Sequence, residues 1–289
     1  MPISNKFNTT TLFSASRTSD SALSEPVLAE TLPERQTRHA PELLTLELDF
    51  ARVSHQADTT SQSHPHVLFS PIHYEPGYAY PLLVWLHGSG SDERQVMRMM
   101  PEISMRNYVA VAPRGLTVSA PDSAKTNNQT NNFDVYSILR SHPKESYDWL
   151  NTDEKLTEIE QRVFDCIAIA KERCNIASNR VFLAGLGNGG TMALRLALLY
   201  PENFAGVASL DGAFPQNDRL LHCWETTRLL SVFLAIGESD TTNSSESVCQ
   251  VLELLHTAGI TVKFREYAKS LTSAMLQDFN RWMMNIVCG

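Results

Sequence analysis

A glycine-rich turn between a predicted strand and a predicted helix is the segment of this sequence that most directly suggests chemistry. Residues 181–190 read VFLAGLGNGG, and two kinds of site use such a turn. Gly185, Gly187 and Gly190 match GxGxxG, and Asp211 follows the next predicted strand, where an acid would bind the ribose of a dinucleotide. Alternatively, a small-x-nucleophile-x-small pattern forms a nucleophile elbow, with Gly187 at the nucleophile position.

The elements that would position this turn alternate along the chain. Apolar runs of strand length alternate with helical patterns, which predicts an α/β protein with a mostly parallel central sheet and helices on both faces. The expected strands are 43–53, 82–86, 108–112, 181–184, 204–210, 229–236 and 261–267, and the expected helices are 91–105, 154–174, 191–199, 245–258 and 271–287. Ligands of such sheets bind at the carboxyl ends of the strands, so the loops there are expected to carry the site.

The chain changes character near residue 40. Residues 1–40 are rich in Ser and Thr and lack a sustained period, which predicts a disordered tail followed by one domain over 41–289. A polar stretch over 115–143 is too long for an ordinary connection, so we expect it to be functional or disordered.

Composition excludes several classes of partner. The 289 residues are 43 % hydrophobic and carry 24 basic against 32 acidic side chains, and the resulting net charge of −8 argues against nucleic acid. The apolar runs are too short for a membrane span, and the N-terminus lacks the apolar segment of a signal peptide. Five cysteines without a CxxC pair indicate reduced thiols in the cytoplasm. No metal or cofactor is expected.

The order of the motifs resembles one family. The segment 81–93, PLLVWLHGSGSDE, places His-Gly and a small-residue loop after a strand, and the glycine turn, a Tyr-Pro-Glu-x-Phe turn, FLAIGESD and ITVKFREY follow in order. Together they resemble the phospholipase/carboxylesterase/acyl-protein thioesterase family of α/β-hydrolases over about residues 42–284. A dinucleotide-binding fold gives no account of the His-Gly loop, so the α/β-hydrolase fold is preferred.

The resemblance also reveals two substitutions at the catalytic positions. The family's nucleophilic Ser corresponds to Gly187, which has no atom that could attack a carbonyl. The family's His would fall near Leu271 or Thr272, and the only His after Asp240 is His256, inside a predicted helix. Asp240 stands at the position of the acid and is expected to be a remnant of the triad.

The anion-binding part of the family's site is expected to survive. By resemblance, the oxyanion hole would use the backbone N–H of Asn188 and that of Gly88 or Ser89, and backbone donors do not depend on side-chain identity. His87 belongs to the same loop, where a structural role is favoured over a catalytic one. The hypothesis is a pseudo-hydrolase that binds an ester, acyl or carboxylate ligand or a protein partner. Its alternatives are an active hydrolase with a nucleophile relocated to the 115–143 loop, and a dinucleotide-binding protein.

Overall fold

The computed structural model describes residues 64–118, 146–215, 224–237 and 245–289. The predicted tail, the predicted strand over 43–53 and most of the 115–143 stretch lie outside these residues. The predicted acid, Asp240, also lies outside them. The extent of the domain therefore stays a prediction.

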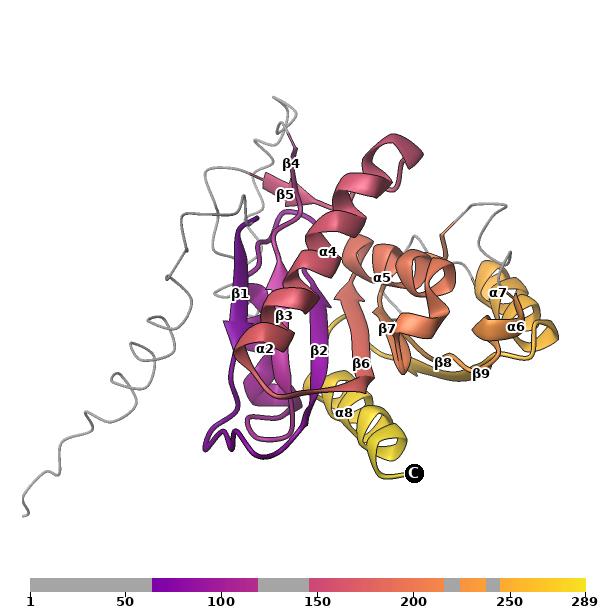
Figure 1. The fold of residues 1–289 in the computed structure, drawn as a ribbon. Coiled ribbons are helices and arrows are strands. Elements are labelled where there is room, and N and C mark those ends of the chain that lie inside the picture. Colours follow the sequence, from indigo (N-terminus) through magenta and orange to yellow (C-terminus); the bar gives the residue numbers. More distant parts are fainter. Residues whose placement is uncertain (1–63, 119–145, 216–223, 238–244) are drawn as a thin grey trace, which may run out of the picture. The chain divides into compact units, whose positions relative to one another are not determined.

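A seven-stranded sheet forms the centre of the protein (Figure 1). Its order is β1-β3-β2-β6-β7-β8-β9, and only β1 runs antiparallel to its neighbour. The strands are β1 His66–Phe69, β2 Tyr80–Leu86, β3 Val109–Pro113, β6 Ile176–Leu186, β7 Gly206–Leu210, β8 Ser231–Gly237 and β9 Thr261–Tyr267. The predicted mostly parallel sheet is confirmed, whereas β1 is an addition that its short, His- and Pro-flanked sequence did not suggest.

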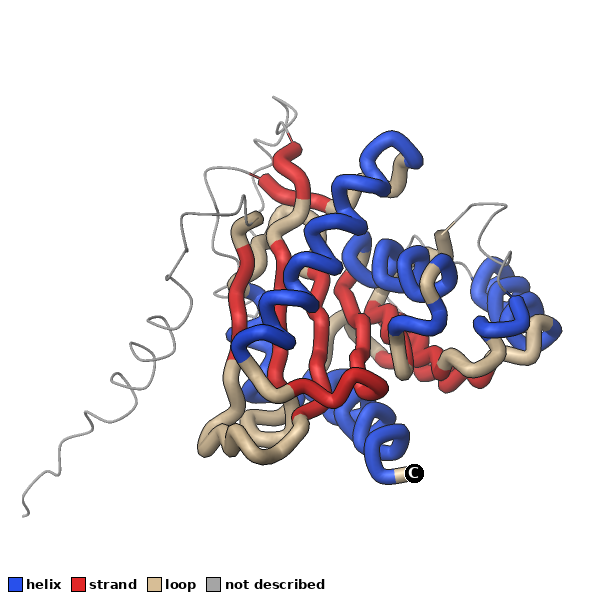
Figure 2. The backbone as a smooth tube through the Cα atoms, viewed as in Figure 1, coloured by secondary structure: helices blue, strands red, loops and turns tan. Residues whose placement is uncertain are grey.

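Helices cover both faces of the sheet (Figure 2). Residues of α4, α5 and α7 pack in one apolar cluster with one face, and residues of α2 and α8 pack in a second cluster with the other. The helices are α2 Gln95–Ile103, α4 Asp153–Arg173, α5 Asn188–Leu199, α6 Trp224–Thr227, α7 Ser245–Thr257 and α8 Ser273–Cys288, with a 3₁₀ turn at Pro201–Asn203. None of the helices within the described residues is both long and apolar enough to cross a membrane.

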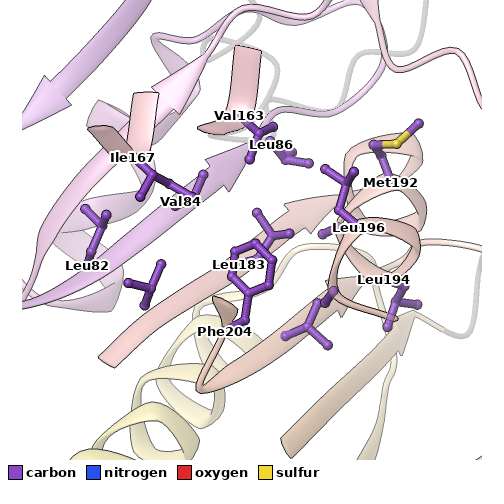
Figure 3. Packing of buried hydrophobic residues seen from close by; sticks show 14 of the residues in the cluster. Leu82, Val84, Leu86, Val163, Ile167, Leu183, Met192, Leu194, Leu196 and Phe204 are labelled. Carbon is purple, nitrogen blue, oxygen red and sulfur yellow. The ribbon is translucent and has the colours of Figure 1, made fainter. Parts of the chain in front are cut away.

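Strand β2 explains why the central strands read as continuous apolar runs. Leu82, Val84 and Leu86 belong to the first cluster, whereas Leu83 and Trp85 belong to the second. All five are 0 % exposed. Figure 3 shows the first cluster, where Val84 lies near Ile167 of α4. Because alternate side chains leave opposite faces of a strand, a strand covered on both sides has no polar position.

A small second sheet stands beside the first. Strands β4 Leu116–Val118 and β5 Ser146–Asp148 pair antiparallel, and Tyr147 also bridges to Ser91. Strand β4 lies at the start of the polar stretch predicted over 115–143, and β5 follows shortly after its end. The pairing of these two strands brings residue 148 to the carboxyl edge of β2.

Helix α2 begins later than predicted. The sequence placed Asp92 and Glu93 in the first helical turn, but α2 begins at Gln95 and has no acid there. Both acidic residues are buried, and Glu93 forms an ion pair with Arg114, with Nη2 at 2.6 Å from Oε1. The predicted start was wrong because Glu93 serves a tertiary contact, whereas Asp92 accepts the N–H of Arg94 through Oδ1 at 3.0 Å just before the helix begins.

Candidate functional site

The glycine turn joins β6 directly to α5. Gly187 lies between the two elements with φ 54° and ψ −124°, and its N–H donates to the carbonyl of Leu210 at 2.8 Å. Residues with a side chain rarely adopt this left-handed backbone conformation, which costs a non-glycine residue about 1–3 kcal/mol. A β-carbon placed on Gly187 would meet no heavy atom within 4 Å. The tip of the turn is thus open, and the backbone conformation alone favours glycine there.

The neighbouring glycines have a different reason to be glycine. A β-carbon on Gly185 would lie 2.3 Å from the carbonyl carbon of Gly189. One on Gly189 would lie 2.4 Å from the carbonyl oxygen of His87, and one on Gly190 would lie 2.9 Å from that of Gly185. Backbone segments pass so closely here that only glycine fits. This packing explains the GxGxxG spacing without a dinucleotide.

Asp211, the proposed ribose ligand of the dinucleotide hypothesis, lies just after β7. Its backbone has φ 55°, and its N–H donates to the carbonyl of Ala235 at 2.8 Å. Its carboxylate Oδ1 accepts the N–H of Gly237 at 2.6 Å. The side chain therefore ties the end of β7 to the end of β8.

His87 follows β2 and is 0 % exposed. Its Nε2 accepts the N–H of Gly115 at 2.9 Å, so the ring proton resides on Nδ1, which donates to the carbonyl of Gly88 at 2.9 Å. Burial lowers the pKa of His87 and keeps the imidazole neutral. With both nitrogens engaged inside the protein, the ring supports the loop, and this geometry gives it no direct contact with a ligand.

The structure distinguishes between the two oxyanion candidates on the loop after β2. The N–H of Gly88 donates to Oε1 of Gln95 at 3.1 Å, and this oxygen also accepts Nε1 of Trp85 at 2.9 Å. Within the part of the chain that the structure describes, the N–H groups of Ser89 and Asn188 have no protein acceptor. Asn188 is the first residue of α5, where the helix dipole favours negative charge. Ser89 and Asn188 are therefore the better pair of anion donors.

Asp148 connects these two donors, a role that the sequence did not suggest. Its carboxylate accepts Oγ of Ser89 at 3.0 Å and Nδ2 of Asn188 at 3.2 and 3.1 Å. It also accepts the N–H of Trp149 at 2.7 Å. Asp148 ends β5 after a long polar stretch, and no motif around it marks a site.

Thr272, at the expected position of the base, caps a helix. Its Oγ1 accepts the N–H of Met275 at 3.2 Å at the start of α8. The preceding loop reaches the carboxyl end of β8, because a β-carbon on Gly237 would lie 2.5 Å from the backbone nitrogen of Ser270. The loop thus reaches the edge of the sheet where the family's base would act, and Thr272 has no group that could accept a proton there.

The sheet order, the helices on both faces and the sharp turn after β6 define an α/β-hydrolase fold. The phospholipase/carboxylesterase family model matches residues 73–286, and the chain belongs to that family. The predicted fold and family are therefore confirmed.

Known relatives agree with this assignment. The chain is 24 % identical over 228 residues to a probable carboxylesterase SOBER1-like of Arabidopsis thaliana, covering 74 % of this chain and 82 % of that one. It is 24 % identical over 229 residues to the carboxylesterase SOBER1 of the same plant, covering 73 % and 92 %. Its fold is similar to the crystal structure of a Bacillus cereus carboxylesterase, with a TM-score of 0.58, 18 % identity and coverage of 78 % and 96 %.

Proposed function

We propose that this protein is a non-catalytic member of the phospholipase/carboxylesterase family that binds an acyl ligand at the tip of the turn after β6. One observation carries the proposal: Gly187 has the backbone conformation of a nucleophile elbow but no side chain. The turn is kept and the attacking atom is missing. Without a nucleophile, an acyl-enzyme cannot form at this position.

The absence of a base supports the same conclusion. In a Ser-His-Asp triad, the His takes the proton from the nucleophile, and loss of either group removes most of the rate. Thr272 stands at that position and uses its hydroxyl to cap α8. The loss of two cooperating groups fits a protein that is retained for binding.

Among the described residues, the hydroxyl groups of Ser89, Thr191 and Ser209 near the turn offer no replacement nucleophile. Ser89 donates to Asp148, and Thr191 Oγ1 lies 3.5 Å from the carbonyl oxygen of Gly187. Ser209 is 1 % exposed beneath the turn. None of these three hydroxyls pairs with a histidine, which activation of a serine or threonine usually requires.

The binding function is supported by the two free donors of the oxyanion site. The side chains of Ser89 and Asn188 meet on Asp148, and in the proposed site their backbone N–H groups would donate to a ligand carbonyl oxygen, with the dipole of α5 adding to this attraction. An ester or amide carbonyl is the group that such donors recognise in the family's chemistry.

The test combines p-nitrophenyl butyrate hydrolysis with fluorophosphonate labelling. We expect the wild-type protein to hydrolyse hardly faster than a Gly187→Ala control and to remain unlabelled. Gly187→Ser or Thr272→His alone should recover little, whereas the double variant should give burst kinetics. Strong wild-type activity that survives Gly187→Ala and disappears when a serine within 119–145 becomes alanine would overturn the proposal in favour of a relocated nucleophile.

A further inference from the structure

We propose that Asp148 determines which acyl compounds this site accepts, admitting uncharged carbonyl ligands such as amides and esters and rejecting free carboxylates. The inference rests on the proposed binding function and specifies its ligand class. Asp148 does not contact the space above Gly187, but it is hydrogen-bonded to Ser89 and Asn188, the two residues that would hold a ligand oxygen.

The geometry places a negative charge beside the anion donors. Asp148 accepts hydrogen bonds from the side chains of Ser89 and Asn188, the same two residues whose backbone N–H groups have no acceptor among the described residues. A ligand oxygen on those N–H groups would therefore bind to the same two residues whose side chains hold the carboxylate. Asp148 is partly exposed, so solvent screens its charge only in part.

Nearby charges do not neutralise Asp148. Among the ion pairs within the described residues, none includes Asp148. Of the cations beside this loop, Arg114 is bonded through two nitrogens to Glu93 at 2.6 and 2.7 Å, and Arg162, which donates to the carbonyl of Gly115, is paired with Glu158 at 2.8 Å. Burial lowers the pKa of His87 despite the opposing influence of Glu93, Asp92 and Asp148, so this ring adds no positive charge. Among the described residues, the charge that remains beside the two donors is therefore that of Asp148.

The same carboxylate also supplies a negative group to the start of α5. The N-terminus of a helix favours a negative group, and Asn188 at the start of α5 is bonded to the carboxylate of Asp148. The protein thus supplies its own anion at this helix. A second anion would meet a like charge, whereas an amide or ester carbonyl brings only a partial charge to the two N–H groups.

Hexanoate and hexanamide are suitable probes because they have nearly the same shape and differ in charge. Their binding can be followed by ¹H–¹⁵N NMR through the amide signals of Ser89 and Asn188. Removal of a like charge at this range should strengthen hexanoate binding by roughly 3- to 10-fold. Asp148→Asn should therefore raise hexanoate affinity by that factor and change hexanamide affinity by less than about 2-fold. Glu154→Gln, which removes an exposed charge at the start of α4, is the matched control and should change neither.

Salt provides a measurement that needs no variant. In the wild-type protein, raising the ionic strength should strengthen hexanoate binding and leave hexanamide unchanged, because salt screens the repulsion. If hexanamide binds but neither salt nor Asp148→Asn changes the ratio of hexanamide affinity to hexanoate affinity, the role of Asp148 is refuted while acyl binding stands. If neither probe shifts Ser89 or Asn188 in any variant, both proposals fail.

Discussion

Replacing Gly187 with alanine tests whether this turn is open at its tip and strained only in its backbone. A β-carbon there meets no atom within 4 Å, so no steric cost is expected. The backbone has φ 54° and ψ −124°, which costs a residue with a side chain about 1–3 kcal/mol. For a domain of this size, that loss lowers Tm by roughly 2–10 °C.

Gly189→Ala is the matched comparison, two residues away in the same turn. Its β-carbon would lie 2.4 Å from the carbonyl oxygens of both Leu86 and His87. Both contacts are with backbone atoms at the end of β2, so relief requires movement of the strand. We expect a loss above about 4 kcal/mol, a large share of the 5–15 kcal/mol that typically stabilises a domain.

Urea unfolding followed by circular dichroism measures both variants against wild type. The expected order is wild type, then Gly187→Ala, then Gly189→Ala, with a clear gap between the two variants. Equal losses for the two substitutions would refute the open tip. A loss below about 0.5 kcal/mol for Gly187→Ala would refute the backbone strain, because alanine would then fit without cost.

Three further outcomes follow from the contacts around the site. Thr272→Ala removes the cap of α8 and should cost about 1 kcal/mol in urea unfolding. Arg114→Met leaves the Glu93 side chain, which is 5 % exposed, without its partner, so we expect a loss of about 3 kcal/mol, part of which Glu93→Gln should restore. The pKa of His87 is lowered in the folded state, so at pH values below the ordinary histidine pKa of about 6.5 the unfolded state binds more protons than the folded state. Stability should thus be lower at pH 5.5 than at pH 7.5, and His87→Gln should reduce this difference.

The elements predicted correctly are those whose burial follows from their position in the sheet. Strands β2, β3, β7, β8 and the second half of β6 read as apolar runs because they are buried within the covered sheet. The edge strand β9 is partly exposed and alternates apolar with polar residues, and α4 shows a helical period because one side packs inward. Strands β1, β4 and β5 were missed. They have three or four residues each and are defined by their pairing partners, so their local sequence carries no periodic signal.

Some features of the candidate site also follow from the sequence alone, and others depend on contacts between distant segments. The lack of an attacking atom at position 187 could be deduced from the sequence, because glycine has no side chain in any conformation. The choice of Ser89 over Gly88 could not, because it depends on Gln95 accepting the Gly88 N–H. The buried and fixed position of the His87 ring could not be predicted from the sequence either, because it depends on the hydrogen bond that the N–H of Gly115 donates to Nε2.

The sequence by itself determined the family, most strands and helices of the central sheet, and the absence of a side chain at position 187. These depend on residue identity and on patterns within one element. Only the tertiary structure decided which polar groups remain free and which charge stands beside them. Asp148 lies 59 residues from Ser89 and 40 from Asn188 in the chain. Ser89 and Asn188 meet because the parallel strands β2 and β6 bring their following loops to one edge of the sheet, and Asp148 reaches them from β5, where Tyr147 bridges to Ser91. Hydrogen bonds across such distances depend on how loops meet in space, which no local pattern encodes.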